Sequence, residues 1–561
     1  MRWKLLLPGV VLLAVIGLVS FVTHQPLKGV ATEESARPTA DIDESIQKVN
    51  TFFARRWAGE DLPPAKQANE LTVLRRVTLA LMGTVPSLEE IRAFEQDSGT
   101  DRLQRWTARF LRDQRYFDYF AERLARGFVG VDAGEIVIYR RDRFLNWLSN
   151  QLETNRPYSE LVREMIGGNG LWTDEPEVNF LMAGYVKEEG FNENKLAGRT
   201  TRAFLGQRID CAQCHDHPFD HWKQNEFAGL AAHFGQLKLS AVGVREDRDL
   251  KFEVEDRNTL EKKVVEPAVP FGEKWEPTDG TRRERLAAWV THPENRRLER
   301  AIVNRVWGLL FGRSWIEPVD DLPDPPGEEL ASKNVEGAKH PKSSKAGELD
   351  LLDVLGADFR EHGYDLRRLI EVIVASKPFL LESQSDIDDS QRLDRMKEHF
   401  AIFPLTRLRP EQIIGSLLQS SSLTTIDQNS HLISRFIKLT RSNDFVKEYG
   451  DLGENELEDR AGTIPQALLR MNGNLINETI DAKPFTASGR IAGMAKDDRK
   501  CLELCFLVCL TRRPTNAEFE ELMPLLSDKR PNGKDNFVSR GGRVEDIYWI
   551  LFNSPEFAWN H

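Results

Sequence analysis

The chain has 561 residues, more than one hydrophobic core usually organises, and this length predicts two or three domains. It carries 76 basic against 88 acidic residues, a net charge of −12, and no long run of Lys or Arg. These features exclude the usual electrostatic basis for following a phosphate backbone, so we expect no nucleic-acid partner.

The first 24 residues resemble an export signal or a membrane anchor. Arg2 and Lys4 precede an uncharged apolar run from Leu5 to Val22, and a basic start followed by such a run is typical of exported proteins. The run is about 18 residues long, near the lower limit for a membrane-spanning helix, so a cleaved signal and an uncleaved anchor both stay open. In either case we expect the body to be periplasmic or at the cell surface.

After a polar tether at 25–45, the pattern predicts a mainly α-helical protein. We expect a helical domain at 46–240 and a second one at 281–561. A connector at 241–280 contains a stretch, 249–269, that alternates like a β-hairpin. Residues 327–348 are rich in Gly, Lys and Ser and predict a flexible insertion.

Helix boundaries are marked by capping residues. Gly83 is a candidate helix end, and Ser87 followed by Glu90 forms a capping-box pattern that predicts the next helix start. Asp365 precedes an apolar helical stripe that Pro378 ends. No internal repeat of fixed period is apparent.

The stretch CAQCHDHPFDHW, residues 211–222, concentrates thiol and imidazole groups in a chain with five Cys and eleven His. Cys211, Cys214 and His215 match C-x-x-C-H, the attachment signature of c-type haem. Two thiols at this spacing can each join one haem vinyl group, and the adjacent His then serves as the proximal iron ligand. We therefore expect haem c here.

Other interpretations of the same residues stay open. Cys211 and Cys214 could bind zinc or iron together with neighbouring side chains. The candidate metal ligands are His215, His217, Asp220 and His221. The two cysteines could instead form a disulfide or redox pair in an oxidising compartment. The sequence assigns no catalytic residues.

A low-spin haem iron needs a second axial ligand, commonly Met or His. Met165, Met182 and His233 are the nearest candidates by sequence. Core packing is the simpler role for both methionines. A five-coordinate iron and a bis-His iron are therefore both compatible with the sequence.

Elsewhere the chemical signals are weak. Cys501, Cys505 and Cys509 repeat every four residues along an apolar helix, and this spacing predicts core packing rather than a metal site. Asp320 and Asp321 form a carboxylate pair before three prolines, where capping and turning the chain is the expected role.

Long motifs resemble one family. FLGQRIDCAQCHDHPFDHWKQNEFAGLAAHF in the first half and LAAWVTHPENRRLERAIVNRVWGLLFGRSWIEPVDDL in the second are similar to the planctomycete cytochrome-like exported proteins, which pair two domains of unknown function. The resemblance covers most of residues 70–560. It implies haem attachment at Cys211 and Cys214 and ligation by His215, with Asp216 to Asp220 completing the family pattern.

The chain departs from that pattern in one helix of the first domain. ERLARGFVGVDAGE stands where relatives have an aromatic, Arg-rich segment, so any site built there is altered in this protein. The leading hypothesis is an exported haem protein that transfers electrons to a redox partner protein or acts on a small ligand. The alternative is an exported enzyme or scaffold with a zinc or iron site.

Overall fold

A computed structural model describes residues 39–131, 139–218, 220–255, 261–326, 350–385, 387–427, 429–430, 444–451, 453, 457, 463–527 and 540–561. The chain divides into two compact units, Met1–Asp43 and Glu44–His561. In the first unit only Thr39–Asp43, the start of helix α2, are described.

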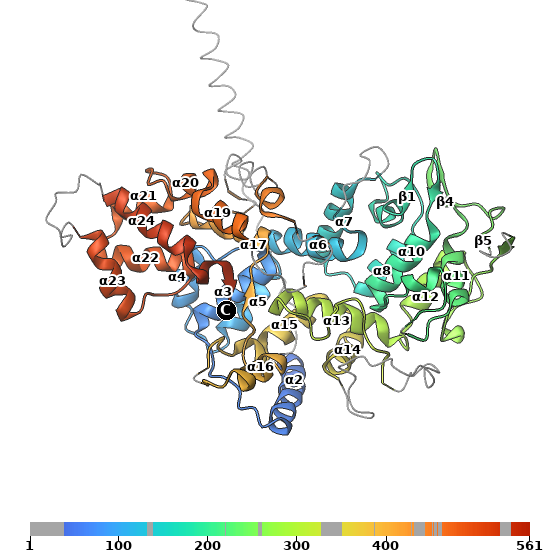
Figure 1. Ribbon diagram of the computed structural model, residues 1–561, viewed down its shortest axis with the longest axis horizontal. Coiled ribbons are helices and arrows are strands. Elements are labelled where there is room, and N and C mark those ends of the chain that lie inside the picture. Colours follow the sequence, from blue (N-terminus) through green and yellow to red (C-terminus); the bar gives the residue numbers. More distant parts are fainter. Residues whose placement is uncertain are drawn as a thin grey trace, which may run out of the picture. The chain divides into compact units, whose positions relative to one another are not determined.

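Helices dominate the first half, as the sequence predicts (Figure 1). Among the described residues, the long helices are α2 (Thr39–Gly59), α3 (Glu70–Met82), α4 (Leu88–Gln96), α5 (Arg102–Phe110), α6 (Gln114–Val129), α7 (Arg141–Thr154) and α8 (Tyr158–Gly167). Shorter helices and single helical turns follow: η1 (Pro176–Val178), α9 (Asn179–Met182), α10 (Glu193–Thr200), the π-helical turn η2 (Thr201–Leu205), η3 (Asp210–Gln213), α11 (Gln224–Ala231) and η4 (Ala232–Phe234).

The described strands form only two-stranded antiparallel hairpins or pairs. They are β1 (Tyr185–Val186) with β2 (Gly190–Phe191), β3 (Leu237–Ser240) with β4 (Gly243–Glu246), β5 (Glu253–Glu255) with β6 (Lys262–Val264), and β7 (Thr406–Arg407) with β8 (Trp559–Asn560). The β5–β6 hairpin lies in the stretch where the sequence predicted one, and a second hairpin, β3–β4, spans the predicted boundary at 240. The additional hairpin begins at Leu237. The sequence pattern did not reveal it, because its alternation is only four residues long on each strand and directly follows a helical pattern.

The second half is helical again. Its described helices are η5 (Glu273–Trp275), α12 (Arg282–Val290), α13 (Arg296–Phe311), α14 (Leu351–Glu361), α15 (Leu366–Ala375), η6 (Lys377–Leu380), α16 (Ser390–Glu398), α17 (Pro410–Ser420), α19 (Ile464–Asn472), α20 (Asn474–Ile480), α21 (Ala487–Met494), α22 (Asp498–Leu510), α23 (Asn516–Leu526), α24 (Arg540–Asn553) and η8 (Pro555–Ala558). The mainly α-helical fold class is thus confirmed.

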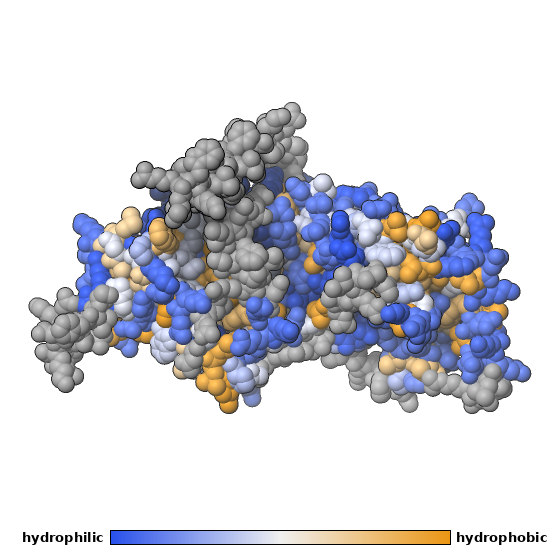
Figure 2. Space-filling view, turned by 90° about the horizontal axis from the view of Figure 1, so that it is seen from above, coloured by the Kyte–Doolittle hydropathy of each residue, from blue (hydrophilic) through white to orange (hydrophobic). Residues whose placement is uncertain are grey.

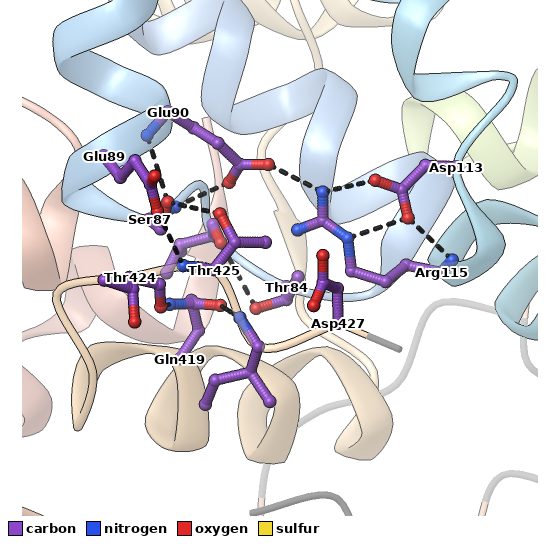
Figure 3. Close-up of polar contacts among 12 residues, drawn as sticks. Thr84, Ser87, Glu89, Glu90, Asp113, Arg115, Gln419, Thr424, Thr425 and Asp427 are labelled. Carbon is purple, nitrogen blue, oxygen red and sulfur yellow. Dashed lines mark hydrogen bonds and ion pairs between the residues drawn. The ribbon is translucent and has the colours of Figure 1, made fainter. Parts of the chain in front are cut away.

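The capping residues lie where the sequence placed them. Gly83 ends α3 in the left-handed conformation, at φ 65°. Ser87 then caps α4 as a reciprocal capping box with Glu90 (Figure 3). Glu90 also pairs with Arg115 at 2.6 Å. The Ser87 hydroxyl lies 2.9 Å from that of Thr425, so the box also joins α4 to the loop after α17.

α13 is the central helix of the Glu44–His561 unit. Every residue from Arg297 to Phe311 is buried, and the helix packs against α3, α14, α15 and the turn η2. Charged groups on a buried helix are costly unless they are paired, and Arg300 lies 2.6 Å from a carboxylate oxygen of Asp353. On the face drawn in Figure 2, the described surface is mostly hydrophilic with small apolar patches.

Several sequence predictions fall outside the described residues. The segment 1–24 and the insertion 327–348 lie there. Helix α2 begins at Thr39, inside the segment 25–45 predicted to be a tether. In the described part of the chain, no helix has the length and apolar character needed to cross a membrane. The proposed domain limits at 240 and 281 stay a prediction.

Candidate functional site

The Cys-x-x-Cys-His segment follows a tightly fastened turn. Gly206 closes the π-helical turn η2 in the left-handed conformation, at φ 62°. Its carbonyl accepts a hydrogen bond of 2.7 Å from the amide of Leu322, and the side chain of Gln207 donates to the Leu322 carbonyl at 2.8 Å. The chain leading into the motif is therefore held by a segment 115 positions later in the sequence.

Cys211 lies in η3, a single 3₁₀ turn, and Cys214 follows that turn directly. Ala212 is buried between them, whereas Cys211 is exposed and Cys214 half-buried. The Cys214 amide makes a long hydrogen bond, 3.5 Å, to the Cys211 carbonyl. Both thiols are free and reachable from solvent.

His215 is exposed, and one of its two ring nitrogens is occupied. Nδ1 lies 2.7 Å from the backbone carbonyl oxygen of Asp216. A carbonyl oxygen only accepts hydrogen bonds, so Nδ1 carries the proton. In the neutral ring Nε2 then keeps its lone pair, and a backbone carbonyl on the other nitrogen is a common arrangement for metal-ligating histidines.

Asp216 fixes the loop between the motif and α11. Its carboxylate accepts hydrogen bonds from the backbone amide of Gln224 at 3.0 Å and from the ammonium of Lys223 at 3.1 Å. The bond from Gln224, followed by that from Lys223, lowers the pKa of the carboxyl group. The two hydrogen bonds hold Asp216 in place, and its backbone carbonyl in turn orients the His215 ring.

Asp220 and His221 form a separate pair. The Nδ1 atom of His221 lies 2.7 Å from an Asp220 oxygen, and its ring packs on Trp222 at a centroid distance of 4.2 Å. Burial lowers the pKa of His221, but the hydrogen bond with Asp220 and the charges of Asp324 and Asp220 outweigh it, so the pKa is raised. The backbone carbonyl of Trp222 in turn accepts a 2.8 Å hydrogen bond from the His217 amide.

The structure does not gather these side chains into a metal-ligand group. Within the described ranges, no three His, Cys, Asp or Glu side chains are grouped so that they could hold a metal ion. The assignment of His215, His217, Asp220 and His221 as metal ligands stays a prediction. What is observed is a pair, Asp220 with His221, a few residues after two accessible thiols.

None of the candidate second axial ligands reaches the surface. Met165 and Met182 are buried in the core. His233 is fully buried, with Nδ1 3.1 Å from the Gly229 carbonyl and Nε2 3.2 Å from Glu276. Both of its nitrogens are therefore engaged by oxygen atoms within the fold.

A cavity of about 550 Å³ opens beside the turn that carries the motif. Asp210, the residue before Cys211, lines it and pairs with Arg202 at 2.8 Å. Asp320 lines it as well and pairs with Arg208 at 2.6 Å. The carboxylate of Asp320, which the sequence suggested would cap a turn, thus faces a basic cavity.

Sequence reasoning missed this cavity and its buried guanidinium, Arg305. The signal was present: α13 carries several Arg residues on a helix that is otherwise apolar. Buried arginines of this kind are usually paired, and only the three-dimensional structure separates the paired ones from those that face a cavity. The core role expected for Cys501, Cys505 and Cys509 agrees with their complete burial in α22.

The fold and the site together define a largely helical protein with a surface-exposed Cys-x-x-Cys-His turn. Two family models match the chain: PSCyt2, a protein of unknown function (DUF1549), over residues 48–238, and PSD1, a protein of unknown function (DUF1553), over 282–333 and 337–444. The chain belongs to the proteins that pair these two domains in this order. No curated protein and no solved structure matches it.

Proposed function

We propose that the protein is exported and carries haem c on Cys211, Cys214 and His215, and that it serves electron transfer or haem-based chemistry on a small ligand. The observation that carries the proposal is the state of the three side chains. Two free thiols lie on one solvent-accessible turn, and the hydrogen bond from His215 to the Asp216 carbonyl leaves Nε2 available for iron.

The residues present fit such a group. Haem bound there would supply reversible one-electron iron chemistry. The thiols would hold it covalently and His215 would bind the iron through Nε2, with the ring held by Asp216. Asp220 and His221 lie a few residues on, paired with each other, and would shape the rim.

The exposure of Cys211 and His215 suits contact with a redox partner protein, because electron transfer requires that the cofactor edge come close to the partner surface. The zinc or iron alternative requires three or more converging ligands. The described residues contain no such group, so this alternative has no geometric support among them and is kept as an outcome of the test.

The first prediction is covalent haem attachment. Full-length protein matured in an export-competent host with a haem c attachment system should retain haem after denaturing electrophoresis. Cys211→Ala and Cys214→Ala should each reduce the retained haem at least several-fold. Cys505→Ala is the matched control, because that thiol is buried in α22, and it should retain haem fully.

His215→Ala separates ligation from attachment. It should change the visible spectrum of the bound iron. The amount of haem that stays on the polypeptide after denaturation should be largely unchanged, since thioether bonds do not depend on the axial ligand. Matured protein without haem but with stoichiometric zinc or iron would contradict the proposal and support the alternative.

Export is tested separately. A reporter that is active only outside the cytoplasm, fused after residue 45, should be active, because residues 1–24 carry the basic start and apolar run of an export signal. The same fusion lacking residues 5–22 is the control and should be inactive. Equal activity of the two fusions would show that this segment does not direct export.

A further inference from the structure

The cavity beside the Cys-x-x-Cys-His motif lies between the two regions of the chain that the family models match. Its lining comes partly from the PSCyt2 region, at 127–210, and partly from the PSD1 region, at 305–320. Binding sites are frequent at such domain boundaries, and about 300–1,000 Å³ is the usual volume for a small organic ligand. The observed volume, about 550 Å³, is within that range.

The charged groups around the cavity are mostly cationic. Five basic side chains line it against three acidic ones, Asp210, Glu317 and Asp320, an excess of two positive charges; the basic ones are Lys195, Arg199, Arg202, Arg208 and Arg305. Each acid already has a cation: Asp210 pairs with Arg202, Asp320 with Arg208, and Glu317 with Arg313 at 3.2 Å. The lining acids therefore do not neutralise Arg305.

Arg305 is the unusual member of the set. Only 6% of it is exposed, yet it has no hydrogen bond or ion pair with any residue that the structure describes. An isolated buried charge is costly, and proteins normally pair one. Arg305 lines the cavity, so its guanidinium is placed to meet a bound anion.

Gly127 makes the room for this guanidinium. A Cβ atom at Gly127 would lie 2.6 Å from Cζ of Arg305, too close for the present arrangement. Gly127 lies in the last turn of α6 (Gln114–Val129), and glycine inside a helix costs roughly 0.5–1 kcal/mol relative to alanine. α6 thus has a residue of low helix propensity, Gly127, at the point where the guanidinium of Arg305 packs against it.

We propose that this cavity binds a small organic oxyanion, a carboxylate or a phosphate ester, held by the guanidinium of Arg305. The planar fork of arginine matches two oxygens of such a group, and burial strengthens the bond. Lys195 and Arg199 line the same cavity and add to the positive field. This site is separate from haem attachment and does not depend on it.

Isothermal titration of the full chain with citrate and with inorganic pyrophosphate tests the proposal. The reference is sodium chloride at equal ionic strength. At least one probe should bind saturably. Arg305→Gln should weaken that binding roughly tenfold to a hundredfold, the usual worth of a charge-assisted hydrogen bond. Arg143→Gln, an exposed arginine outside the cavity, is the matched control and should leave binding unchanged.

Gly127→Ala keeps the charge and provides a second variant. It should weaken the same binding by displacing the guanidinium, while the helix gains propensity and the fold is retained. Absence of saturable binding by both probes would overturn the proposal. So would equal binding by wild type, Arg305→Gln and Gly127→Ala, because the anion would then be held by general surface charge.

Discussion

Buried arginines in this protein are satisfied in different ways. Arg76 donates to the carbonyl oxygens of Phe379 at 2.8 Å, Leu381 at 2.7 Å and His561 at 2.8 Å, and so fastens α3 to the end of the chain. Burial lowers its pKa to about 9, which still leaves it charged at neutral pH. Arg305 has no comparable set of acceptors among the described residues, which is why we assign it a ligand.

Glu556 gives a pH-dependent contribution to stability. Burial raises its pKa, but hydrogen bonds from Arg512 and His561 outweigh this and lower the pKa from 4.5 to about 2. The charged form of Glu556 is therefore stabilised more in the folded state than in the unfolded state. The resulting stability is present above pH 4.5 and is lost as the pH falls towards 2.

Glu556→Gln should accordingly lower the free energy of unfolding by about 1–2 kcal/mol at pH 7, a value reduced for partial solvent screening. The difference from wild type should shrink between pH 4.5 and 2, measured by thermal unfolding with circular dichroism. Glu520→Gln, an exposed glutamate on α23, should have little effect at any pH. A Glu556→Gln deficit that is constant with pH would contradict this assignment.

At the scale of single elements, the sequence predicted what depends on local chemistry. The caps at Gly83, Ser87 and Asp365 and the helices that they bound follow from a few adjacent residues, and all three are observed. Contacts between distant segments were not predictable in this way. The cavity needs Gly127 on α6 and Arg305 on α13, which no short-range pattern connects.

The capping box of α4 is a test of one such local prediction. Ser87→Ala removes a side-chain acceptor from the Glu90 amide at 3.0 Å and a contact with Thr425 (Figure 3). Loss of such a cap should cost about 1 kcal/mol, measured as a lower urea midpoint. Ser98→Ala, at an exposed position after the same helix, is the control and should be neutral. Equal midpoints for both variants would mean that the cap contributes nothing measurable.

At the scale of the whole Glu44–His561 unit, the two matched families are joined at the candidate site. Gly206 and Gln207 of the PSCyt2 region hydrogen-bond to Leu322 of the PSD1 region, and Arg208 pairs with Asp320. Asp324 accepts from Arg297 at 2.7 Å and lies 4.0 Å from His221. The PSD1 region thus supports the turn that carries Cys211, which gives a physical reason for the pairing of the two domains in one chain.

This support can be measured at Gly206. A Cβ there would lie 2.9 Å from Cδ1 of Leu322, in addition to the strain of a left-handed backbone at φ 62°. Gly190 is the matched control, since it has a positive φ of 93° but no atom within 4 Å of the position that a Cβ would take. Gly206→Ala should therefore lower the melting temperature more than Gly190→Ala, because strain alone costs about 1–2 kcal/mol.

The excess should come from the contact with Leu322 and not from the turn itself. In a Leu322→Ala background, which removes Cδ1, the cost of Gly206→Ala should fall towards that of Gly190→Ala. Thermal unfolding of the four variants in this double-mutant cycle gives the coupling directly. A coupling of zero would mean that the Leu322 side chain adds nothing to the cost of Gly206→Ala. A clear coupling would show that the turn ahead of Cys211 and the PSD1 segment at Leu322 are energetically linked.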